Sequence, residues 1–176
     1  MNRRAFIAGL GSAAAWSVVA RAQQPAMPVI GFLKDQSADN SKIETVAFLQ
    51  GLKETGYVEG QNIVVEYRFA ENQLDRVPAL AADLVHLRVA VILASSTPAA
   101  LAAKAATATI PIVFVIGTDP VALGFVASLN RPGANLTGIA ILSAELAPKR
   151  LQLLRELMPK AAVFGVLADP VFLPLQ

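Results

Sequence analysis

Residues 89–107 read VAVILASSTPAALAAKAAT, in which a short apolar run is followed by polar residues and then by an alanine-rich segment. The apolar run from Val89 to Ala94 predicts a buried strand, and the segment from Pro98 to Thr107 predicts a helix. Between them, Thr97 is suited to cap the helix and Pro98 to occupy its first position. A strand that passes directly into a helix is the repeating unit of a parallel sheet.

The same alternation extends in both directions along the chain. Apolar or β-branched runs predict further strands at residues 28–33, 63–70, 112–116, 136–142 and 162–167. Amphipathic patterns predict further helices at residues 41–55, 74–87, 120–129 and 145–157. The strand at 63–70 alternates apolar and polar residues, which is typical of an edge strand with one wetter face. Together these elements predict an α/β fold with a doubly wound parallel sheet and helices on both faces.

The first 22 residues have the composition of an export signal peptide. Arg3 and Arg4 open it and resemble a twin-arginine signal, and an uncharged run from Ala5 to Ala20 follows. An uncleaved membrane anchor is the alternative, but the run is shorter than the roughly 20 apolar residues that a spanning helix needs. We therefore expect cleavage after Ala22 and a mature protein in the periplasm.

A glycine pattern at residues 9–14 matches a dinucleotide-binding turn, but it lies inside this leader and not between a strand and a helix. We therefore expect no nicotinamide, flavin or other cofactor.

Charge and composition exclude several classes of protein. The chain has 15 lysines and arginines, of which Arg3, Arg4 and Arg21 lie in the leader, so 12 remain against 13 acidic residues. A mature chain with a net charge of −1 and no basic cluster is a poor partner for nucleic acid. Cysteine is absent, which excludes disulfides and thiolate metal sites, and we expect no metal.

Two predicted strands end in similar polar sequences, Ser95-Ser96-Thr97-Pro98 and Gly117-Thr118-Asp119-Pro120. Ligands of open parallel sheets bind beyond the carboxyl ends of the strands, where helices begin. The hydroxyls of Ser96, Thr97 and Thr118 and a helix amino terminus could receive an anionic group, and Asp119 could receive an ammonium. Helix capping alone explains Thr97 and Asp119 equally well, so both interpretations stay open.

Catalytic groups are scarce. His86 is the only histidine, and the helix predicted at 74–87 places it off the apolar stripe and away from any strand end, so we expect it to be a surface residue. Asp35, Asp39 and Asn40 share a polar loop that either lines a cleft or is solvated, and the solvated state is favoured. We expect no enzymatic activity and no catalytic residue.

Six stretches in the order of the chain carry a family resemblance. They are GLKETGYVEGQNI at 51–63, TPAALAAK at 97–104, IPIVF at 110–114, DPV at 119–121, SLNRPGANLTG at 128–138 and KRLQLL at 149–154. With them, residues 28–170 resemble the periplasmic substrate-binding proteins of ABC transporters, in the family that has tryptophan- and tyrosine-binding members.

The resemblance implies a monomer that closes two lobes on a small ligand, such as an amino acid or a related compound, and delivers it to a membrane permease driven by a cytoplasmic ATPase. It implies that strand ends hold the ligand, which points to Ser96, Thr97, Thr118 and Asp119. It also points to Lys34 and Gln36 in the loop after Leu33.

Family members continue for about as long again with a second lobe, whereas this sequence stops at Gln176. We therefore expect a first lobe at 23–142, and a crossover at Ser143 that leads into a truncated second lobe at 143–176, with impaired ligand binding. Two other classes share the doubly wound fold, the ligand-binding domain of a sugar-responsive regulator and an exported flavodoxin-like enzyme. Such a regulator would need a DNA-binding module, for which this sequence has no spare residues between the leader and the first strand. Such an enzyme would need a phosphate-cradling loop after the first strand, where residues 31–36 contain only one glycine.

Overall fold

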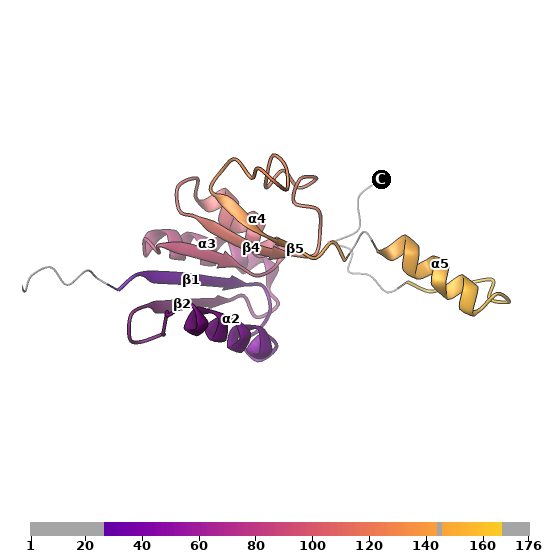
Figure 1. Cartoon of the computed structure of the whole chain (residues 1–176), viewed down its shortest axis with the longest axis horizontal. Helices are drawn as coiled ribbons and strands as arrows, with labels where there is room; N and C mark the ends of the chain where they lie inside the picture. The colour runs from indigo at the N-terminus through magenta and orange to yellow at the C-terminus, as the bar shows by residue number, and fades with distance from the viewer. Residues whose placement is uncertain (1–26, 144–145, 167–176) are drawn as a thin grey trace, which may run out of the picture.

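A computed structural model describes residues 27–143 and 146–166; the expected signal peptide lies outside them. Five parallel strands form one sheet in the order β2-β1-β3-β4-β5 (Figure 1). Their bounds are Val29–Lys34 for β1, Val64–Phe69 for β2, Val91–Ala94 for β3, Ile112–Ile116 for β4 and Leu136–Ala140 for β5. The α/β sheet is confirmed, and β2 lies at an edge as its alternating pattern predicts.

Helices connect the strands on both sides of the sheet. They are α2 (Lys42–Glu54), α3 (Val77–His86) with a preceding 3-10 turn η1 (Leu74–Arg76), and α4 (Thr97–Ala106). A further helix, α5 (Ala147–Leu157), follows the last strand. The chain steps from β1 to β2 in one direction and from β3 to β4 in the other. Because such crossovers are right-handed, α2 lies on one face and α3 and α4 on the opposite face.

The face below α3 and α4 is closely packed. Its core residues include Leu84 of α3, Ile92 of β3 and Ile112 of β4, each completely buried. A Cβ atom at Gly31 would lie 2.9 Å from a methyl carbon of Leu84, so the missing side chain lets α3 approach β1. This close fit makes the α3–α4 layer the rigid side of the lobe.

On the other face, α2 covers only the β1–β2 side of the sheet. The ring of Phe32 lies 5.5 Å from that of Phe48 on α2 and 5.7 Å from that of Tyr67 on β2. No residue of α2 is fully buried. The aromatic cluster therefore fixes α2 at its inner surface while the rest of the helix remains open to solvent.

The helix predicted at 120–129 is wrong. Residues 120–124 form a turn, in which Phe125 donates its backbone N–H to the carbonyl of Pro120 at 2.8 Å. Gly124 adopts a positive φ of 64°, which ends the helical path, and Phe125 and Val126 then insert into the core. Burial of these two side chains replaces the helical continuation that the pattern suggested.

The sixth strand predicted at 162–167 is also wrong for its described part, because residues 161–166 have no regular structure. Val163 is 86% exposed, and no described strand pairs with this segment. The helix expected at 145–157 is present as α5, which lies apart from the sheet with every described side chain exposed (Figure 1). None of the described helices is long and apolar enough to span a bilayer.

Candidate functional site

A cleft of about 750 Å³ opens at the carboxyl ends of β1, β3 and β4. The loop after β1, the loop between β3 and α4, and the end of β4 supply its floor. The direction of winding reverses between β1 and β3, and ligands of doubly wound sheets bind at such a reversal. Ala147 and Arg150 of α5 complete the rim.

The start of α4 forms one wall of the cleft. Ser96, and not the predicted Thr97, is the capping residue: its hydroxyl accepts the backbone N–H of Ala99 at 3.2 Å. Ser96 has the extended backbone of a cap, so its side chain can turn back over the first turn, whereas Thr97 is already helical. This shift frees the hydroxyl of Thr97 from capping.

Thr97 and Thr118 come together in the lining of the cleft. Their side-chain oxygens lie 3.3 Å apart, although the residues follow different strands. Both line the cleft, as the sequence suggested for ligand-binding hydroxyls. The pair offers adjacent donors and acceptors to a polar group of a ligand.

Asp119 is placed differently from its neighbour. Its carboxylate accepts the backbone N–H of Val121 at 2.8 Å and so caps the turn that replaces the predicted helix. It is not among the residues that line the cleft. The capping interpretation is therefore the one that its contacts support.

Lys34 and Gln36 both line the cleft. Lys34 is buried at the end of β1, where its ammonium lies 2.5 Å from a carboxylate oxygen of Glu44 on α2. The hydroxyl of Ser95, at the end of β3, donates to the other oxygen of Glu44. This network links α2 to the strand ends and gives the ammonium of Lys34 a protein partner. Gln36 is exposed and presents its amide at the rim of the cleft.

Sequence reasoning missed several cleft residues. Glu44 carried no signal, because it was one polar residue in an amphipathic helix. Ser143 follows β5, and its hydroxyl donates to the carbonyl of Gly117 at 3.3 Å, which closes the cleft floor. Asp35 lines the cleft, although a solvated loop was favoured for it, whereas Asp39 of the same loop does not. The signal for Asp35 was its place between Lys34 and Gln36, which the resemblance had already pointed to.

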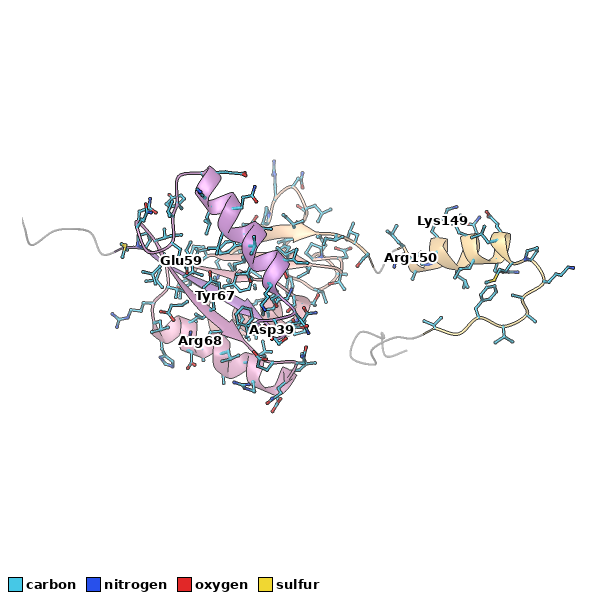
Figure 2. The ribbon with its side chains drawn as sticks, turned by 90° about the horizontal axis from the view of Figure 1, so that it is seen from below. Asp39, Glu59, Tyr67, Arg68, Lys149 and Arg150 are labelled. Carbon is cyan, nitrogen blue, oxygen red and sulfur yellow. The ribbon has the colours of Figure 1, made fainter. Side chains whose placement is uncertain are left out.

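Outside the cleft, the charged side chains of Asp39 and Lys42 form an ion pair with each other. Asp39 lies 2.8 Å from Lys42, whose hydrogen bond and positive charge lower the pKa of the Asp39 carboxyl. Figure 2 shows Asp39 on the α2 side of the lobe, and Lys149 and Arg150 on the separate α5. His86 is exposed on α3, as predicted. Within the described ranges, no group of three or more histidine, aspartate and glutamate side chains is placed to hold a metal ion.

Comparison with known proteins agrees with this architecture. The model of the ABC transporter substrate binding protein family matches residues 26–173. The chain belongs to this family. A tyrosine-binding protein from Clostridioides difficile strain R20291 is 39% identical to this member over 121 residues, which are 68% of this chain and 34% of the relative.

Three solved structures are similar to this family member. A conserved domain protein from Vibrio cholerae has a TM-score of 0.67 at 30% identity, over 77% of this chain and 45% of that one. An open, ligand-free substrate binding protein with adhesive properties from Clostridium difficile has a TM-score of 0.60 at 29% identity, over 76% and 45%. An ABC domain from Streptococcus pneumoniae in complex with L-Trp has a TM-score of 0.60 at 26% identity, over 65% and 39%.

This chain therefore spans about a third of the curated relative and less than half of each of these solved structures. The match confirms the expected family and the fold of the lobe that carries the cleft.

Proposed function

We propose that this chain is the solute-binding component of an ABC importer and that the cleft beyond β1, β3 and β4 holds part of a small ligand. The meeting of Thr97 and Thr118, which follow β3 and β4 beside the switch point, is the observation that carries the proposal, since it assembles ligand-facing hydroxyls from two separate strand ends. Ser96 acts by holding the first turn of α4, and Gln36 contributes an amide at the rim.

The ligand that this cleft suits is an amino acid or a related compound. A tyrosine-binding relative and an L-Trp complex among the similar structures support this choice. The partners that we propose are a membrane permease and its cytoplasmic ATPase, with the protein acting in the periplasm after removal of residues 1–22. The role is binding and release, and no enzymatic step is involved.

We further propose that residues 23–142 form one lobe and that residues 143–176 belong to the crossover and the start of a second. The leucines of α5 support this division, because Leu151, Leu153, Leu154 and Leu157 are all exposed. The described residues supply one wall of the cleft, so we expect this chain to bind more weakly than a two-lobed relative.

A thermal-shift screen of the 176-residue chain against amino acids, short peptides and small carboxylates tests the binding role. A ligand that binds only the folded state raises Tm by mass action, so a selective rise is expected. A variant with Thr97→Val and Thr118→Val, which keeps the side-chain shape and removes both hydroxyls, should lose that rise while it remains folded. A native chain whose Tm is unchanged by every compound would contradict the proposal.

A further inference from the structure

Asp35 directly follows β1 and lines the cleft, yet its carboxylate has no protein partner in the described part of the chain. Its Oδ1 atom is buried and makes no hydrogen bond there. No cation of the described residues lies within ion-pairing distance of it. A buried carboxylate oxygen without a donor is unfavourable in water-excluded surroundings, so such an atom at a cleft marks a place for a missing donor.

Two donors that line the same cleft are already engaged with another partner. The ammonium of Lys34 is held by Glu44 at 2.5 Å, and Ser95 donates to the same carboxylate. The positive and negative charges of Lys34 and Glu44 therefore cancel at the cleft wall. Asp39, four residues along the same loop, differs in that it is 84% exposed and paired with Lys42. Among the described residues that line the cleft, Asp35 alone presents a carboxylate without a cationic partner, and it does so at the switch-point side.

We propose that Asp35 is a specificity-determining residue that selects ligands with a cationic nitrogen; this inference rests on the proposed binding role of the cleft. A ligand ammonium supplies both the charge and the N–H donors that the carboxylate lacks. The hydroxyls of Thr97 and Thr118 lie on the opposite side of the reversal, between β3 and β4, and remain available for another polar group. A neutral ligand of the same shape would leave the carboxylate unpaired.

Three probes distinguish the contribution of the ligand's ammonium group to binding from that of its carboxylate group. L-Tryptophan carries an ammonium and a carboxylate, tryptamine keeps only the ammonium, and indole-3-propionate keeps only the carboxylate. Binding of each to the 176-residue chain is measured by backbone amide NMR titration at constant ionic strength. We expect L-tryptophan to bind roughly 10-fold to 100-fold more tightly than indole-3-propionate, as a hydrogen bond to a charged group implies.

Asp35→Asn keeps the shape of the side chain and removes its charge, and should reduce this preference to less than about 3-fold. Asp39→Asn is the matched control, since it removes the same charge from the same loop outside the cleft, and should leave the preference unchanged. Asp35→Ser repeats the test in case the amide perturbs the loop, and the melting temperature of each variant checks its fold.

The outcomes are distinguishable. Equal binding of L-tryptophan and indole-3-propionate to the native chain, or a preference that survives in both Asp35 variants, overturns the role of Asp35 and leaves the binding function standing. Absence of binding by all three probes overturns an aromatic amino acid as the ligand of this cleft, and the role of Asp35 in selecting it.

Discussion

The two faces of the sheet are built from similar residues but are buried to very different extents. On the α3–α4 face, Ile92, Ile112 and Phe114 are almost completely buried. On the α2 face, the β3–β5 side is open and forms an apolar groove of about 560 Å³, lined on these strands by Val91, Leu93, Val113, Val115 and Ile139. Parallel sheets are normally covered on both faces, so the open side is the unusual one.

The difference shows that the type of an apolar residue does not by itself decide how much that residue contributes to the stability of this lobe. Successive residues of a strand point to opposite faces, so Ile92 and Leu93 are neighbours in sequence and belong to different environments. The α3–α4 face supplies most of the stabilisation by burial, whereas the α2 face depends on one helix and an aromatic cluster.

A pair of neighbouring truncations tests this asymmetry most strongly. Ile92→Ala should lower the free energy of unfolding by about 2 to 5 kcal/mol, because it opens a cavity in a closely packed core. Leu93→Ala should cost less than about half as much, since its side chain faces the open groove. Urea unfolding monitored by circular dichroism measures both. Equal losses would show that the α2 face is as well packed as the other.

Hydrogen exchange should show the same asymmetry in the helices. Four alanines of α4 are buried, whereas no residue of α2 is. We expect the central amides of α2 to exchange at least about 10-fold faster than those of α4, because local opening of α2 exposes less apolar surface. NMR-detected exchange at neutral pH measures this ratio. Equal protection of α2 and α4 would break the comparison.

The capping of the helices gives a smaller expected effect. The side chain of Ser96 caps α4, whereas Ser41 makes no side-chain capping bond to α2. Ser96→Ala should therefore lower the free energy of unfolding by about 1 kcal/mol. Ser96→Asn, which restores a capping oxygen, should recover most of this loss in the same unfolding measurement. A loss that asparagine does not recover would assign the effect to packing instead of capping.

Most of the sheet could be predicted from the sequence because buried parallel strands consist of nearly continuous apolar residues. The strand expected at 112–116 has those bounds in β4, and the helix expected at 41–55 differs from α2 by one residue at each end. The failure at 120–129 has a tertiary cause, since Phe125 and Val126 pack into the core and override a local helical pattern. A single local window could not reveal that competition.

The candidate cleft was predicted only where its residues follow strands directly. Ser96, Thr97 and Thr118 were found because strand ends meet at one edge of a parallel sheet, although their role in binding stays a prediction. Glu44 was missed because its partner Ser95 lies 51 residues away in sequence. For Asp119 the sequence left capping and ligand binding open, because either role places an aspartate at the same position in the chain; its contact with Val121 supports capping.

The pKa of the Tyr67 phenol reports how well the α2 face is covered, and it gives the smallest of the expected effects. Burial, followed by the charge of Glu59 and a weak hydrogen bond to it at 3.4 Å, raises the pKa of Tyr67 to about 12 (Figure 2). Because the neutral phenol is favoured in the folded state, this contribution to stability is present below the ordinary pKa of tyrosine and is lost as pH rises toward about 12. An ultraviolet titration of phenolate absorbance should show a component near pH 12 that disappears in Tyr67→Phe. A Tyr67 component near pH 10, the ordinary value for tyrosine, would mean that water reaches the aromatic cluster and that α2 leaves even the β1–β2 side of this face uncovered.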